Sequence, residues 1–230
     1  MEIPAKQVYG ILRDNGVKAI YHANSVITSC QFLRAGSLLS KETVERKGLY
    51  QSAQRSDQID KKYGIWFDIF TDCVDIHLRA SKANIYGPVL FIFDSEIIKN
   101  TITGGVWMTK LNPTKWEGKQ RGKKWFVSKE DLEQNFARGE FDQMVVFRQC
   151  GGELPFENFL KEIILDDPDL KSRKSNIDYY SMAYGALRLA ITEGRINVEI
   201  KKRQCPENCK CLEYYKSNLK KTNEMFIPKI

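Results

Sequence analysis

The histidine at position 22 is the first residue whose type and setting could carry chemistry. His22 is one of two histidines in the chain, and it ends the apolar run "AIYH" shortly before Ser25, a typical N-cap for a helix over 26–35. An imidazole at such a strand-to-helix corner either makes a structural hydrogen bond or meets a ligand. His22 is therefore a candidate site residue whose role depends on its neighbours.

A second group of reactive side chains lies in "WFDIFTDCVDIH", residues 66–77, where Asp68, Asp72, Asp75 and His77 stand between aromatic and apolar residues. Carboxylates and imidazoles can hold a divalent ion or transfer protons. The same alternation also fits acids on the solvent side of a strand edge. This acid and histidine cluster is one candidate centre for a metal-dependent nuclease.

A second nuclease-like pattern lies nearer the C-terminus. "DDPDL" carries Asp169 and "VEIKK" carries Glu199 and Lys201, which spells Pro-Asp followed by Glu-x-Lys after an intervening helical segment. The two carboxylates could hold Mg²⁺, and the lysine could stabilise the charge that develops on a phosphate. These three residues are the alternative nuclease site.

The segment "CPENCKC" places Cys205, Cys209 and Cys211 close together. Three thiolates could bind zinc, but the segment has no CxxC pair, and neither histidine is near it in the sequence. The sequence therefore favours a polar turn with reduced cysteines and no metal.

The charge balance indicates an anionic partner. Lys and Arg outnumber Asp and Glu by 36 to 29, and the net charge is +7. The stretch "KWEGKQRGKKWF", residues 115–126, mixes basic and aromatic residues, which combines phosphate attraction with surfaces for base stacking. From it, we expect a nucleic-acid-binding set of Arg121, Lys123, Lys124 and Trp125.

Several protein classes lack their sequence features. The chain has no P-loop, G-x-G-x-x-G or G-x-S-x-G motif, which argues against Walker NTPase, Rossmann dehydrogenase and serine hydrolase chemistry. It also has no apolar run long enough to span a membrane and no signal-peptide pattern at the N-terminus. We expect a cytoplasmic protein without membrane contact.

Hydrophobic periodicity predicts an α+β protein, a single compact domain with a central mixed or antiparallel sheet. Residues 1–170 form its main part, and residues 171–230 form a C-terminal helical extension packed on it. The polar stretch 41–63 is expected to be a long loop or a mobile helix, and residues 73–81 a strand or a helix. Strands are predicted at 17–22, 63–70, 87–94, 106–111, 142–149 and 195–202, and helices at 5–14, 26–35, 129–136, 156–165 and 176–194.

The segment "IYHANSVITSCQFLRAGSLLS", residues 20–40, resembles the opening of the DarT-like ADP-ribosyltransferases, toxins that move ADP-ribose from NAD to nucleic-acid bases. The order of later elements is also similar: "GIWFDIF", then "GPVLFIF", then "DQMVVF". The resemblance runs in order over residues 18–166 and is most specific over 20–40. It implies an ADP-ribosyltransferase-like sheet with NAD as the substrate.

The resemblance also assigns roles to residues. It implies that His22 hydrogen-bonds the NAD ribose beside the nicotinamide, that Asn24 takes the place of a family threonine, and that Tyr86 stacks on the nicotinamide. The family's basic loop, which contacts NAD and the target nucleic acid, corresponds here to Gln54, Arg55, Lys61 and Lys62, with lysines where the family has arginines.

One departure concerns the family's catalytic glutamate, whose place is taken here by Gln143. Cleavage of the nicotinamide glycosidic bond builds positive charge on the ribose, and a glutamine cannot supply the opposite charge. Three explanations follow: an inactive copy, a shifted register in which Glu140 or Asp142 serves, or a different chemistry on a related shape.

The resulting prediction is an NAD-dependent ADP-ribosyltransferase that acts on DNA or RNA as a toxin or phage-defence effector. An antitoxin or another regulatory protein is a possible partner. The alternatives are a metal-dependent nuclease and a catalytically inactive nucleic-acid-binding module.

Overall fold

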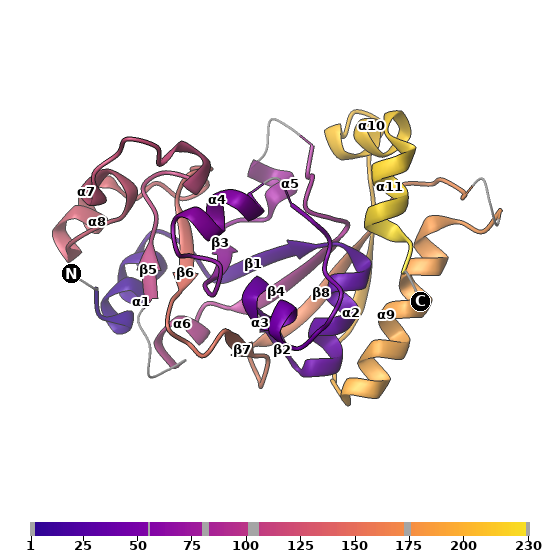
Figure 1. Cartoon of the computed structure of the whole chain (residues 1–230), viewed down its shortest axis with the longest axis horizontal. Coiled ribbons are helices and arrows are strands. Elements are labelled where there is room, and N and C mark those ends of the chain that lie inside the picture. The colour runs from indigo at the N-terminus through magenta and orange to yellow at the C-terminus, as the bar shows by residue number, and fades with distance from the viewer. Residues whose placement is uncertain (1–2, 55, 80–82, 101–105, 173–175, 229–230) are drawn as a thin grey trace.

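A mixed β-sheet runs through the centre of the molecule (Figure 1). The computed structural model describes residues 3–54, 56–79, 83–100, 106–172 and 176–228, without the side chains of residues 78 and 79. Within these ranges the sheet has seven strands in the order β5-β6-β3-β1-β4-β8-β9. The α+β class and the mixed central sheet predicted from the sequence are confirmed. The strands are β1 (Ala19–Asn24), β3 (Ile69–Asp72), β4 (Val89–Asp94), β5 (Val106–Met108), β6 (Met144–Phe147), β8 (Leu160–Asp167) and β9 (Ile200–Gln204).

The centre of the sheet forms because β4 is apolar on both faces. Val89, Leu90, Phe91 and Phe93 are all buried, and β4 pairs antiparallel with β1 on one side and β8 on the other. Among the described strands of this sheet, β8 and β9 are the pair that runs parallel. A parallel pair needs a crossover, which the long helix α9 (Tyr179–Gly194) provides.

The segment 156–165 differs from its predicted helix, because most of it belongs to strand β8. Ile163 and Leu165 are fully buried, whereas Lys161, near the start of the strand, is exposed. The segment pairs with β4 and β9, and these long-range hydrogen bonds override a short helical pattern.

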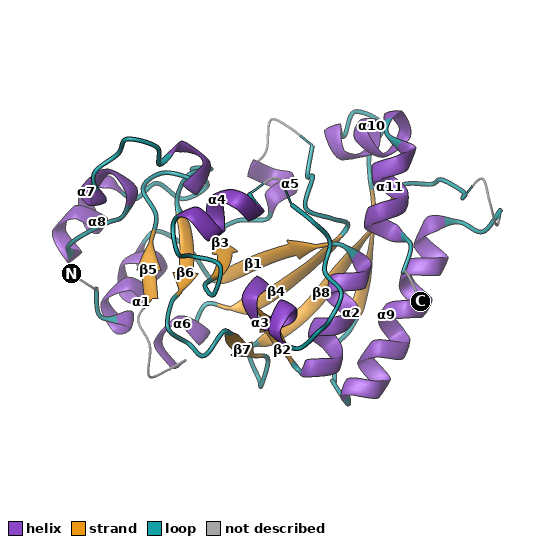
Figure 2. Ribbon diagram, in the orientation of Figure 1, coloured by secondary structure: helices purple, strands orange, loops and turns teal. Residues whose placement is uncertain are grey.

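Helices cover the apolar face of the sheet (Figure 2). Helix α2 (Val26–Ala35) packs against α9, and α11 (Leu219–Phe226) contacts both. Helix α1 (Ala5–Asp14) packs against α6 (Ile97–Asn100) and α8 (Lys129–Asn135) at the other end of the molecule. The remaining helices are α5 (Ile76–Arg79), η1 (Pro113–Lys115), α7 (Arg121–Lys124) and α10 (Lys210–Ser217).

The polar stretch 41–63 contains two short helices where the sequence indicated a loop or a mobile helix. They are α3 (Lys41–Arg46) and α4 (Asp57–Lys62). The hydroxyl of Ser40 accepts the backbone N–H of Thr43, which caps α3. Just before α3, β2 (Ser37–Leu39) pairs with β7 (Glu153–Pro155) in a small second sheet.

The C-terminal segment is built into the same core as the rest of the chain. It adds β9 to the edge of the main sheet, and Phe226 and Tyr215 are fully buried within the main hydrophobic core. Across the described ranges, no helix is both long enough and apolar enough to cross a membrane.

Candidate functional site

The candidate site lies where the main sheet opens between β1 and β3. These two strands share a single register pair, Tyr21 with Asp72, in the described part of the chain. His22 follows directly, and its Nδ1–H donates across the opening to the carbonyl oxygen of Phe70 at 2.8 Å. A pocket begins beside this bond.

The hydrogen bond to Phe70 fixes the state of the His22 ring. A carbonyl can only accept, so Nδ1 carries the proton, and Nε2 of the neutral ring presents its lone pair. Asn24 Nδ2 lies 3.4 Å from Nε2 and donates to it. Burial lowers the pKa of His22, and the Phe70 bond opposes that effect only in part. The ring is therefore neutral at physiological pH, with an acceptor nitrogen toward the pocket.

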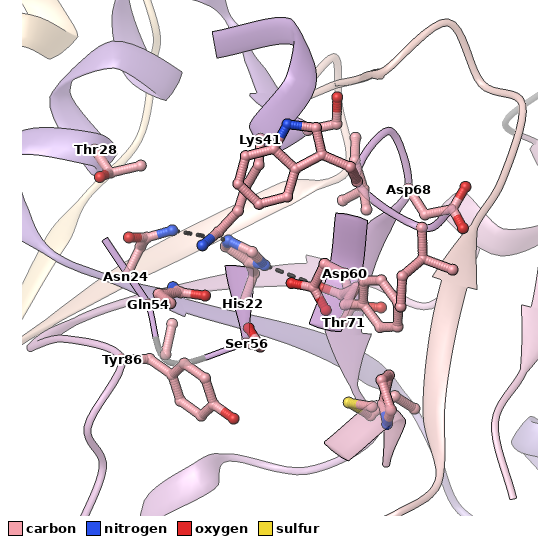
Figure 3. A pocket seen from close by; sticks show the side chains of 18 of the residues that line it. His22, Asn24, Thr28, Lys41, Gln54, Ser56, Asp60, Asp68, Thr71 and Tyr86 are labelled. Carbon is pink, nitrogen blue, oxygen red and sulfur yellow. Dashed lines mark hydrogen bonds between the residues drawn. The ribbon is translucent and has the colours of Figure 1, made fainter. Parts of the chain in front are cut away.

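The pocket holds about 1130 Å³ of empty space when its open mouth is included. In Figure 3, His22 and Asn24 lie near its centre, Lys41 and Asp68 lie on one side, and Tyr86 lies on the other. The pocket is open to solvent, and both polar and apolar side chains line it. The polar side chains that line it include His22, Asn24, Thr28, Lys41, Gln54, Ser56, Asp60, Asp68, Asp72 and Tyr86, with Phe32, Ile65, Phe70 and Met144 among the apolar ones.

The segment that carries Tyr86 is held tightly against β1. Asn84 closes a turn, since its Oδ1 accepts the N–H of Tyr86 at 2.9 Å and its Nδ2 donates to the Gly87 carbonyl at 2.7 Å. Gly87 has a φ of 149°, and a Cβ there would lie 2.2 Å from the carbonyl of Asn24. Only glycine allows this approach, which brings Tyr86 to the pocket beside Asn24.

The segment with Gln54 is anchored to the start of helix α2. The hydroxyls of Ser52 and Ser25 lie 2.7 Å apart, and the Ser52 N–H donates to Thr28 Oγ1 at 3.2 Å. The Gln54 N–H donates to Asp57 Oδ2 at 3.0 Å, at the beginning of α4. These bonds hold the side of the pocket opposite the sheet.

Two carboxyl groups of the pocket have unusual proton affinities. Burial raises the pKa of Asp60 to about 6, although Ser56 and Lys41 favour its charged form. Burial also raises the pKa of Asp68 to about 6, even though Arg148 Nε lies 2.9 Å away and opposes the shift. Such values suit groups that exchange protons near neutral pH.

The structure brings together most of the residues that the sequence assigned to NAD. His22, Asn24, Gln54 and Tyr86 all line this pocket, although the sequence separates the first from the last by the whole of α2, α3, α4 and β3. Arg55 lies outside the described residues.

The residues assigned to the catalytic carboxylate do not line the pocket. Gln143 accepts the Ala137 N–H at 2.8 Å and donates to the Asn135 carbonyl at 3.0 Å, so its side chain secures the turn after α8. Asp142 is buried and pairs with Lys115 at 2.7 Å, and Glu140 is exposed. The pocket-lining residue here is Met144, whereas the two hydrogen bonds of Gln143 hold its side chain at the turn after α8. The pocket carboxylates are Asp60, Asp68 and Asp72, of which the sequence had indicated the last two only as parts of a metal cluster.

The basic residues assigned to nucleic acid come together next to the pocket. The Nζ atoms of Lys62 and Lys124 lie 5.6 and 4.8 Å from the ring centre of Tyr63, so α4 and α7 present one shared basic surface. Lys61 and Lys123 are exposed nearby, and Arg121 lies over Trp107 at 4.9 Å. We call Lys61, Lys62, Arg121, Lys123 and Lys124 the basic face.

Trp125 does not offer the stacking surface that the sequence indicated. Its side chain is 5% exposed, and its ring packs against Trp107 and Trp116 at centroid distances of 5.2 and 4.8 Å. These rings form a small second core that supports the basic face from below.

The nuclease residues near the C-terminus lie apart. The register of the parallel pair sets Ile163 beside Ile200, so Glu199 is level with the start of β8, and Lys201 pairs with Glu162. Asp169 lies beyond the other end of β8, roughly 20 Å away at about 3.3 Å per residue. These residues do not form one metal site.

The acid and histidine cluster of 68–77 is also divided. Asp68 and Asp72 line the pocket, whereas Asp75 pairs with Arg203 at 2.6 Å and His77 with Asp166 at 2.9 Å. His77 instead meets Cys209 and Cys211, and the ligand atoms of the three lie within 4.8 Å of one another. Sequence spacing could not show this group, because 132 residues separate His77 from Cys209.

No protein-family model matches the chain, and a search of curated proteins finds no significant relative.

Proposed function

We propose that this protein binds NAD in the pocket between β1 and β3 and transfers its ADP-ribose to a nucleic-acid base. The observation that carries the proposal is the convergence of His22, Asn24, Gln54 and Tyr86 on one pocket. The resemblance to DarT-like transferases, which runs in order over residues 18–166, assigns these same positions to NAD.

His22 is suited to orient the ribose. Its neutral ring directs the Nε2 lone pair toward the pocket, where a ribose hydroxyl can donate to it in place of the long bond from Asn24. The released Asn24 amide can then donate to a second oxygen of the ligand. Because Phe70 holds the other ring nitrogen, this geometry exists before NAD binds, and that lowers the cost of binding.

Asp60 is the carboxylate that best replaces the missing glutamate. With a pKa of about 6 it is ionised above neutral pH, and it lies in the pocket with His22. Its charge can stabilise the positive ribose that forms when the C1′ bond to nicotinamide breaks and the electron pair leaves with the nicotinamide nitrogen. The attacking base nitrogen then bonds to C1′ and gives its proton to the Asp60 carboxylate.

The basic face supports a nucleic-acid acceptor. It lies beside the pocket, since Lys61 Nζ lies 4.5 Å from the ring centre of Trp66, which lines the pocket. Lysines and arginines at such a position attract a phosphate backbone whatever its base sequence.

The test is incubation of the purified chain with NAD labelled in the ADP-ribose part, over single-stranded DNA, RNA and duplex. We expect label on nucleic acid with the wild-type chain, and at least a roughly hundredfold loss with His22→Ala and with Asp60→Asn. Gln143→Ala is the matched control, and it should retain transfer because its side chain is turned away from the pocket.

Three results would contradict the proposal. NAD binding without transfer would leave a nucleic-acid-binding module. Strand cutting that needs Mg²⁺ and no NAD would favour nuclease chemistry. Transfer that survives in His22→Ala but is lost in Gln143→Ala would move the catalytic group to the segment 140–143.

A further inference from the structure

A second group of reactive side chains lies where the C-terminal helices meet α5. His77 belongs to α5, Cys209 is the N-cap residue of α10, and Cys211 is in the first turn of that helix. Their ligand atoms all lie within 4.8 Å of one another, and His77 Nδ1 is 3.8 Å from Cys209 Sγ. Figure 1 shows α10 near α5, although the two are far apart in the chain.

The ring of His77 is held by a buried network. Its Nε2 lies 2.9 Å from Asp166 Oδ2, and Asp166 is fully buried. Arg203 Nε and Tyr215 OH donate to the same carboxylate at 2.6 and 2.9 Å. A histidine whose outer nitrogen donates to a carboxylate turns its other nitrogen toward a metal ion in many metalloproteins. Here that other nitrogen, Nδ1, points to the thiols.

The two thiols have surroundings that suit metal-bound thiolates. The backbone N–H of Asn84 donates to Cys211 Sγ at 3.1 Å, and such donors stabilise charge on sulfur. Cys209 stands at the N-terminus of α10, where the helix dipole favours negative charge. Both cysteines are free thiols.

From this geometry we propose that His77, Cys209 and Cys211 bind a zinc ion. Zinc bonds of about 2.3 Å to sulfur and about 2.0 Å to nitrogen, in a tetrahedron, set two sulfurs about 3.8 Å apart and a nitrogen about 3.5 Å from each sulfur. The 3.8 Å separation of His77 Nδ1 and Cys209 Sγ is therefore about 0.3 Å longer than the zinc-bound spacing, which a small side-chain movement can close. Thiolate and imidazole together favour zinc over the hard cations Mg²⁺ and Ca²⁺. Water can complete the tetrahedron.

The ion would join three distant parts of the chain. It links α5 to α10, and the bond from Asn84 to Cys211 connects it to the turn that carries Tyr86. The role is structural, because it fixes one wall of the pocket. The zinc proposal does not depend on the proposed transferase function, since it concerns metal content and stability.

The first measurement is the zinc content of the full-length chain, purified without chelator and supplied with zinc. We expect about one zinc ion per chain in the wild type and loss of that ion in Cys209→Ser and Cys211→Ser. Cys150→Ser is the matched control, because Cys150 is half-buried outside this group and should leave the zinc content unchanged.

A second measurement covers the case in which the serine variants do not fold. Replacement of zinc by Co²⁺ in the wild type should give the visible bands of a tetrahedral site and a sulfur-to-cobalt charge-transfer band. Chelation should lower the melting temperature, and added zinc should restore it. A wild-type chain that takes up no zinc, or a Cys209→Ser chain that keeps it, would overturn the proposal.

Discussion

At the scale of single residues, burial in the pocket shifts the pKa values of His22 and Asp60 in opposite directions for the same physical reason. It lowers the pKa of the imidazole and raises the pKa of the carboxyl, because a poorly hydrated site disfavours both charged forms. Asp68 follows the same rule. The pocket therefore holds neutral His22 at neutral pH, whereas the charge on Asp60 is maintained at a cost in stability.

That cost gives a prediction for Asp60→Asn. The pKa of Asp60 is about 6 in the folded chain and 3.8 in the unfolded chain. Protonated Asp60 therefore stabilises the folded state fully below pH 3.8, and this stabilisation is lost as the pH rises through 6. At pH 8, the amide should raise the free energy of unfolding by about 2 kcal/mol, with allowance for the part of the carboxyl that water reaches.

Urea unfolding at pH 8 and at pH 4 measures this effect. Near pH 4 the gain should shrink toward zero, because the folded wild-type carboxyl is then protonated like the amide. An equal gain at both pH values would show that burial does not perturb Asp60. The same substitution should abolish transfer, so stability would rise while activity falls.

At the scale of elements, the contact between α2 and α9 depends on one glycine. The sequence marks Gly194 as a helix terminator, and α9 does end there, but the left-handed residue is Arg195, with a φ of 53°. Gly194 instead allows close approach, since a Cβ there would lie 2.0 Å from the Leu33 carbonyl oxygen.

Two alanine substitutions in α9 should therefore have opposite effects. Gly194→Ala forces α9 away from α2 and should cost about 2 kcal/mol of stability. Gly185→Ala, on the exposed face with no atom near the new Cβ, should add about 0.5–1 kcal/mol through helix propensity alone. The melting temperatures of the two variants test this prediction. An unchanged melting temperature for Gly194→Ala would mean that α9 and α2 can separate without loss of stability.

At the scale of the whole molecule, the basic face lies toward one end of the fold and the C-terminal helices lie at the other. Figure 1 shows α7 at the left end, α4 nearer the middle, and α10 and α11 at the right. The net charge of +7 is a property of the whole chain, so composition does not say which end meets a polyanion. The structure favours the end with α4 and α7, because Lys62 and Lys124 meet over Tyr63 beside the pocket.

Paired substitutions at the two ends of the molecule distinguish which surface binds nucleic acid. Lys62→Gln with Lys124→Gln should weaken binding to single-stranded DNA and lower the slope of log affinity against log salt by roughly 1.4, at about 0.7 per lost phosphate contact. Lys216→Gln with Lys220→Gln, in α10 and α11, removes the same charge and should change neither quantity. Equal effects from both pairs would indicate binding through net charge alone.

Local patterns in the sequence were sufficient for much of the fold. The apolar run of β4, the amphipathic α9 and the strand ending near His22 follow from periodicity and cap residues, which act over a few positions. The α+β class follows from their order. The pocket residues His22, Asn24, Gln54 and Tyr86 were indicated by a resemblance in sequence, not by any local pattern.

Only the tertiary structure decided which groups meet. Pairing with β4 and β9 made 160–167 a strand. Hydrogen bonds to Ala137 and Asn135 hold Gln143 away from the pocket, while α4 brings Asp60 into it. His77 reached Cys209 and Cys211 through the same long-range packing. Local propensity is a property of neighbours in the chain, whereas a site depends on strand register and helix packing between residues far apart, and these are fixed only when the whole core forms.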